Sequence, residues 1–146
     1  MTSQHNFGGI WRSTYWYPSN THEGEDTSEY VVTVHQHGDK LTIVSVPNAI
    51  DAHITINLTV DGKLATGTWT EHTSPDGEFE AMVYSGAVQL LIADDGKHMD
   101  GQWVGVGREK LSDGNYEPRI YNGRWQLLYI KDKAIPEDDD SDQDDQ

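Results

Sequence analysis

Four Gly-x-Trp triplets constrain the fold of this chain more than any other feature of its sequence. They are Gly9-Ile10-Trp11, Gly67-Thr68-Trp69, Gly101-Gln102-Trp103 and Gly123-Arg124-Trp125, and they hold four of the five tryptophans. Because side chains alternate between faces along a strand, the glycine and the tryptophan of a triplet share one face. We interpret the glycine as opening space on that face, which the tryptophan then fills. The repeated triplet predicts a small antiparallel barrel plugged by indole rings.

Two of the triplets belong to a longer repeat that also predicts turns. Residues 61–69 and 95–103 both read Asp-Gly-Lys-x-x-x-Gly-x-Trp. Asp-Gly pairs adopt the positive φ angles of tight hairpin turns, so each copy predicts a turn followed by a strand. Similar turn signals stand at Gly38-Asp39 and Asp76-Gly77.

The chain between these turns predicts an all-β fold. No window shows the 3.6-residue periodicity of a sizeable helix. Short connections favour a single up-and-down antiparallel β-barrel of about eight to nine strands, which closes and so leaves no free edge. The predicted strands are residues 10–17, 29–37, 40–46, 52–60, 63–73, 78–85, 87–93, 98–108 and 120–130, with 78–93 alternatively one ribbon bent at Gly86.

Alternation also predicts what lines the barrel. With each triplet tryptophan pointing inward, its neighbours two and four residues away point inward too. Such an interior is aromatic, partly polar and interrupted by glycine, whereas a core built only for stability is filled densely with aliphatic side chains. The pattern therefore favours a hollow barrel. The predicted inward residues are Ser13, Tyr15, Tyr17, Gly67, Glu71, Gly101, Gly105, Gly107, Leu127 and Tyr129.

Charge divides the chain unevenly. The net charge is −15, and Glu137 to Asp145 supplies seven acids and no base. We predict a flexible N-terminal arm over residues 1–8, a barrel domain over 9–131 and a disordered acidic tail over 132–146. The tail is interpreted as a solubility segment, or alternatively as a docking segment for a protein partner or a mimic of nucleic acid. An acidic body disfavours binding to a nucleic acid polymer.

Composition also bounds the compartment. The chain has no cysteine, which excludes disulfides and thiolate metal sites and favours a reducing compartment. No stretch approaches the ~18 apolar residues of a membrane span, and the first residues lack the basic and apolar regions of a signal peptide. We expect a cytoplasmic protein with no membrane partner.

A set of aromatic and basic residues predicts a ligand-binding site. Nucleobases stack on aromatic faces, and arginine presents a planar fork to phosphate. In the alternative interpretation the aromatic side chains are core and the arginines cap the ends of the barrel. The predicted ligand-binding residues are Arg12, Tyr15, Tyr17, Tyr84, Trp103 and Arg108.

Metal and catalytic sites are not expected. His35 and His37 share one strand face, with His53 and His72 on other strands, and this spacing leaves a metal site open. The preferred interpretation is exposed histidines on a polar face, without metal or other cofactor. Motifs for a nucleophile elbow, a phosphate loop or a zinc protease are absent, and we expect no enzyme. Acids around one hairpin, Glu71 among them, leave a paired acid–base role as a remote alternative.

The triplets resemble those of calycin-like barrels, the group of lipocalins, fatty-acid-binding proteins and avidins. Gly9-Ile10-Trp11 corresponds to the first-strand motif of lipocalins, and residues 62–69 read Gly-x-Leu-x-x-Gly-x-Trp. The chain lacks the other lipocalin landmarks and any recognisable biotin site. The resemblance implies a small-molecule-binding barrel.

Two further resemblances concern function. Residues 11–17, 45–48, 67–77 and 83–92 resemble an uncharacterised sensor domain found behind helix-turn-helix modules in bacterial regulators. Residues 86–92, 101–108 and 123–125 more weakly resemble the barrel of bacterial antiphage effectors that bind cyclic oligonucleotides. These resemblances imply a sensor or sequestering protein for a nucleotide-like second messenger, in bacterial signalling or antiviral defence. The alternative is a protein-interaction module that uses the barrel rim and the acidic tail.

Overall fold

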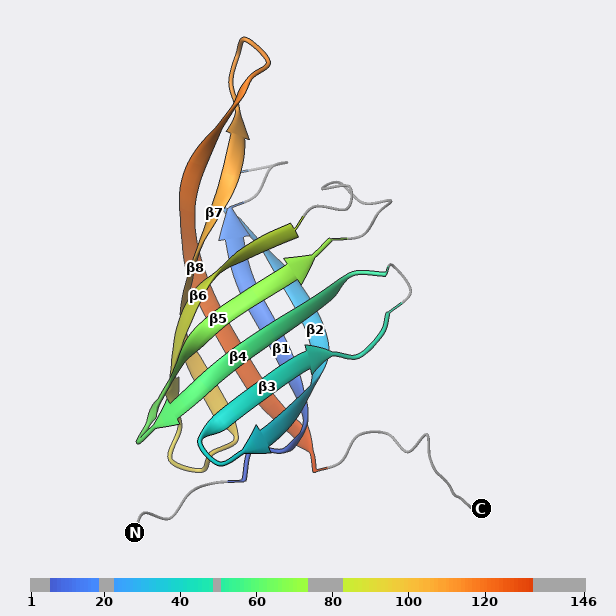
Figure 1. Cartoon of the computed structure of the whole chain (residues 1–146), viewed down its shortest axis with the longest axis vertical. Helices are drawn as coiled ribbons and strands as arrows, with labels where there is room; N and C mark the ends of the chain where they lie inside the picture. Colours follow the sequence, from blue (N-terminus) through green and yellow to red (C-terminus); the bar gives the residue numbers. More distant parts are fainter. Residues whose placement is uncertain (1–5, 19–22, 49–50, 74–82, 133–146) are drawn as a thin grey trace.

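The chain folds into one closed antiparallel barrel, which confirms the predicted all-β, up-and-down architecture (Figure 1). The computed structural model describes residues 6–18, 23–48, 51–73 and 83–132, with the side chains of 108–110 outside the description. Each strand pairs with its neighbour in sequence, and β8 closes the barrel on β1. Within these residues the strands are β1 (Gly9–Pro18), β2 (Glu25–His37), β3 (Lys40–Ser45), β4 (His53–Asp61), β5 (Leu64–His72), β6 (Val83–Ile92), β7 (His98–Lys110) and β8 (Tyr116–Lys131).

Several strand bounds differ from the predicted ones, and β2 begins at Glu25 instead of Glu29. β6 runs through Gly86 as a single strand over its described part, as the ribbon alternative had it. The segment 109–118, predicted as a loop, is mostly hairpin, because the β7–β8 ladder continues to Lys110 and Tyr116. A tight turn at Asp113-Gly114 closes it, with Gly114 at a φ of 90°. The Asp-Gly pair in the sequence indicated a turn, but nothing in the sequence indicated how far the two flanking strands extend toward it.

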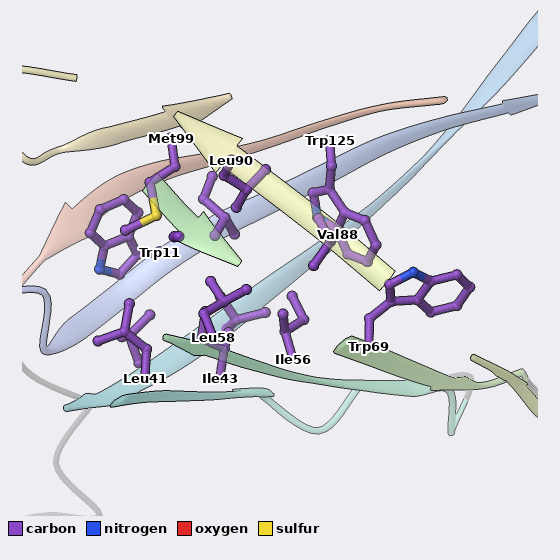
Figure 2. Close-up of a cluster of buried hydrophobic side chains, with 14 of the residues drawn as sticks. Trp11, Leu41, Ile43, Ile56, Leu58, Trp69, Val88, Leu90, Met99 and Trp125 are labelled. Atoms are coloured by element: carbon purple, nitrogen blue, oxygen red, sulfur yellow. The ribbon is translucent and has the colours of Figure 1, made fainter. Parts of the chain in front are cut away.

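All four triplet tryptophans are buried, as predicted, with exposed fractions of 0% for Trp11, 6% for Trp69, 6% for Trp103 and 1% for Trp125. Figure 2 shows Trp11, Trp69 and Trp125 pointing into the barrel among aliphatic side chains from the other strands. Each indole N–H donates to an acceptor inside the protein: to Phe7 O, Ala87 O, Trp16 O and Ser13 Oγ, in the order of the tryptophans. The rings are therefore fixed by hydrogen bonds as well as by packing.

The role assigned to the triplet glycines needs correction. A Cβ built on Gly67 would lie 1.7 Å from the carbonyl oxygen of Asn57, and one on Gly101 would lie 1.9 Å from that of Gln89. Backbone of the adjacent strand, not the tryptophan of the same triplet, fills the space beside these glycines. Glycine is required there because it lets neighbouring strands approach closely.

The two ends of the barrel differ. β1 begins and β8 ends at one end, which we call the packed end, together with the β2–β3, β4–β5 and β6–β7 hairpins (Figure 1). Phe7 covers this end with an exposed fraction of 2%, although residues 1–8 were expected to be a loose arm. Its amide donates to Gln36 Oε1 at 2.8 Å. Residues 1–5 of the expected arm and 133–146 of the expected tail lie outside the described residues.

The opposite end, which we call the cavity end, carries the upper ends of β1, β5 and β7. From it the β7–β8 hairpin projects beyond the rest of the barrel as an arm (Figure 1). Among the described residues, no helix is long and apolar enough to cross a membrane.

Candidate functional site

The barrel holds a cavity of about 230 Å³ at the cavity end. Six strands contribute to its wall, so residues far apart in sequence converge there. Its lining consists of Tyr15, Tyr17, Pro18, Ser28, Trp69, Glu71, Thr73, Tyr84, Trp103, Gly105, Val106, Gly107 and Tyr121.

Six of the thirteen lining residues are aromatic, and four of these rings contact one another. Trp69 and Trp103 meet edge to face with centroids 5.6 Å apart, and Tyr15 meets Trp103 in the same way at 5.9 Å. Tyr15 also lies 4.9 Å from Trp125 and 5.7 Å from Tyr17. Such edge-to-face pairs have preferred geometries, so the rings hold one another in place. The ring contacts therefore fix the shape of the wall.

Two glycines of β7 line the cavity, at inward positions that the alternation of the sequence predicted. A Cβ on Gly105 would lie 2.6 Å from Cζ2 of Trp69, and one on Gly107 would lie 2.9 Å from Cε2 of Tyr121. Both positions face inward, where a larger side chain would displace an aromatic ring or fill the space. The glycines thus let the rings of Trp69 and Tyr121 lie directly against the inner surface of β7.

Glu71 is the one buried carboxylate among the described residues, with an exposed fraction of 7%. The hydroxyl of Tyr15 donates to its Oε1 at 2.5 Å, and the hydroxyl of Tyr30 donates to its Oε2 at 2.6 Å. Burial raises the pKa of both tyrosines far above its ordinary value, and the adjacent Glu71 carboxylate raises it further. Both hydroxyls therefore remain protonated donors at neutral pH.

The carboxylate keeps acceptor capacity for a ligand. Each carboxylate oxygen can accept two hydrogen bonds, and one tyrosine occupies one position on each. Glu71 also lines the cavity, so the remaining positions are within reach of a molecule bound there. In the described part of the chain no lysine, arginine or histidine forms an ion pair with Glu71.

The structure brings together four of the six predicted site residues. Tyr15, Tyr17, Tyr84 and Trp103 all line the cavity. Arg12 does not: it lies on the outer face of β1, where its guanidinium is 3.9 Å from Glu29. Arg108 lies in β7 opposite Pro118, and its side chain is outside the described residues.

Sequence reasoning missed part of the site. Glu71 was predicted to point inward, but not to be the polar centre of the cavity, and neither Tyr30 nor Tyr121 was singled out. Tyr30 shares the inward face of β2 with Val32 and Val34, which are both buried. An acid and a tyrosine at inward positions of a barrel were the available signal, because a buried carboxylate needs hydrogen-bond donors.

The histidines do not gather as the metal alternative required. His35 and His37 are exposed on the outer face of β2. His53 and His72 pair across β4 and β5 and stack on each other at 4.4 Å. Where the structure describes the chain, no three residues of the metal-ligating types lie close enough to hold an ion.

A scan against protein-family models finds no match to this chain, and a search of curated proteins finds no similar sequence. The closed eight-stranded barrel is compatible with the calycin-like architecture. Fold and site together define a small β-barrel with an aromatic cavity at one end.

Proposed function

We propose that this protein binds a small molecule in the cavity, as a sensor or a sequestering protein without catalytic activity of its own. One observation carries the proposal: an aromatic cavity contains a buried carboxylate at one end, while side chains fill the other end. Burial of a carboxylate opposes folding, even when hydrogen bonds offset part of the desolvation. A barrel selected only for stability has no need of such a group.

The size of the cavity bounds the ligand. Pockets for drug-sized molecules span about 300–1,000 Å³, and this cavity is smaller, at about 230 Å³. It suits a molecule with one ring or a short chain. A larger ligand would insert one such group and leave the rest outside the barrel.

The resemblances support a nucleotide-like second messenger as one ligand class, within bacterial signalling or antiphage defence in the cytoplasm. A single base would stack on the aromatic wall, since base–aromatic contacts contribute about 1–3 kcal/mol each. Phosphate groups would then lie outside the cavity, toward the part of β7 that carries Arg108. Arg12 has no part in this version, because it lies on the outer face.

A protein-interaction module is the second candidate, and the β7–β8 arm favours it. Val106 and Ile120 are cross-strand neighbours on this arm, and they are 57% and 68% exposed. Neighbouring exposed apolar side chains are typical of surfaces that contact other proteins. In this version the arm, with the rim and the acidic tail, would contact the partner.

Native mass spectrometry of the full-length protein, purified gently from its source, tests the proposal. We expect a copurified molecule below about 300 Da, or one with a group of that size, bound one per chain. Gly107→Leu, which fills the cavity, should abolish the bound species. Val104→Leu enlarges a side chain on the outer face of the same strand and should retain it. Equal retention by both variants would place the molecule elsewhere and reject the proposal.

A further inference from the structure

We propose that the cavity is selective for an organic cation, a primary or secondary ammonium whose head pairs with Glu71 and whose body lies against the aromatic wall. This inference rests on the proposed function and narrows it to one chemical class. Three features support it: a carboxylate without a counter-ion among the described residues, two indole rings whose N–H groups are already engaged, and an acidic chain.

The carboxylate lacks a counter-charge. Buried charges in proteins are normally paired with an opposite charge or a metal. Three cations of the described residues pair with acids at the protein surface instead: Arg12 with Glu29, Lys63 with Asp94 and Arg124 with Asp100. None of these pairs reaches Glu71. A cation that enters the cavity would supply the missing charge.

The aromatic wall suits a cation as well. Cations are attracted to the faces of tryptophan and tyrosine rings, most strongly where water is excluded. The indole N–H groups of Trp69 and Trp103 already donate to Ala87 O and Trp16 O. These two rings therefore offer a ligand their π-systems rather than hydrogen bonds, and Glu71 offers acceptors.

Net charge points the same way. At −15 the chain attracts cations and repels anions over its surface, and no described residue that lines the cavity is basic. An anionic nucleotide would meet a carboxylate at the centre of the site. The open acceptor positions on Glu71 favour an ammonium with N–H donors over a quaternary ammonium, which has none.

Three molecules with the same aromatic body and different heads test the selectivity: phenethylammonium, 2-phenylethanol and 3-phenylpropionate. Each is titrated into the full-length protein by calorimetry. We expect phenethylammonium to bind about 10-fold to 100-fold more tightly than the alcohol, the range of a charge-assisted hydrogen bond, and the carboxylate to bind least. Equal affinity for the three heads would overturn the inference and leave the proposed binding function standing.

Glu71→Gln is the matching variant, because the amide keeps the shape of the side chain and removes its charge. It should reduce the preference for ammonium over alcohol to about 3-fold or less. Glu29→Gln makes the same change of charge on the outer face, where the carboxylate is exposed, and should leave the preference intact. An equal loss in both variants would mean that the general field of the protein, not Glu71, selects the cation.

The head-group comparison uses the unaltered protein, so it decides the question even where Glu71→Gln does not fold. Guanosine monophosphate serves as the anionic nucleotide arm, and tighter binding of it than of phenethylammonium would overturn the inference. Absence of binding by all three heads would overturn it too. The proposed function would then fall only if native mass spectrometry also finds no copurified molecule.

Discussion

The packed end and the cavity end of the barrel use the same Gly-x-Trp triplet for opposite purposes. At the packed end Trp11 lies among Phe7, Leu41 and Met99, all at most 2% exposed. At the cavity end Trp69 and Trp103 line the cavity together with Glu71 and the glycines of β7. The triplet fixes an indole inside the barrel in both cases. The neighbouring inward residues decide whether that indole fills a core or walls a cavity.

Truncation of the tryptophans should separate the two ends most strongly. Trp11→Ala should lower the free energy of unfolding by about 3–5 kcal/mol, because it removes a fully buried ring from dense packing. For Trp103→Ala the loss should lie at or below the low end of this range, since part of the Trp103 ring already borders a cavity. Urea unfolding of both variants measures the difference. Equal losses would mean that the cavity end is as tightly packed as the other.

Removal of a tyrosine hydroxyl should have a smaller effect that depends on the end. Tyr15→Phe and Tyr30→Phe each take a donor from Glu71, and each should lower the free energy of unfolding by about 1.5–3 kcal/mol, as for hydrogen bonds to charged groups. Tyr129→Phe is the matched control: its ring packs edge to face on Trp11 at the packed end. It should change stability by less than ~0.5 kcal/mol. If Tyr129→Phe lowers the free energy of unfolding as much as Tyr30→Phe does, then the hydrogen bonds to Glu71 contribute no more to stability than an ordinary tyrosine hydroxyl does.

Alkaline pH should weaken the cavity end specifically. The pKa of Tyr15 and of Tyr30 is raised in the folded protein, above the ordinary value near 10 that the unfolded chain retains. Above about pH 10 the unfolded state loses these protons and the folded state keeps them, so stability falls as pH rises. Each tyrosine contributes a slope of up to about 1.4 kcal/mol per pH unit.

Urea unfolding between pH 9 and 11 measures that slope. The stability of Tyr30→Phe should fall less steeply with pH than that of the unaltered protein, because one of the two tyrosine hydroxyls is gone. Slopes that coincide in the two proteins would show that the Tyr30 hydroxyl ionises as readily in the folded state as in the unfolded one.

Deletion of residues 136–146 should have the smallest effect. Seven of the eleven residues are acidic, and the segment has no apolar side chain to bury beyond its proline, so the melting temperature should stay within a degree or two. Differential scanning calorimetry of the shortened and full chains makes the comparison. A large drop would show that the acidic segment docks on the barrel.

Much of the fold was predictable because strand alternation and Asp-Gly turns are local properties. Strand alternation was enough to place Trp103 inside the barrel, and to place Tyr15 and Tyr17 on the same inward face as Trp11. The same alternation excludes Arg12, which follows an inward tryptophan and so must point outward. That consequence was available in the sequence and was not drawn.

The pairing of Glu71 with its tyrosines was not predictable in the same way. Glu71 lies on β5 and Tyr30 on β2, strands that are not neighbours, so the two side chains meet across the interior of the barrel. Their meeting depends on the stagger of all the strands around the barrel, which sets which inward residues share a level. Local sequence patterns carry no record of that stagger.

Indole N–H signals from the tryptophans report on both ends of the barrel in one nuclear magnetic resonance spectrum. Single Trp→Phe variants assign them, and phenethylammonium is then titrated into the full-length protein. Binding at the cavity end should shift the signals of Trp69 and Trp103, which line the cavity, and leave that of Trp11 unchanged. No shift in any signal, or shifts confined to Trp11, would contradict the assignment of the ligand site to the cavity end.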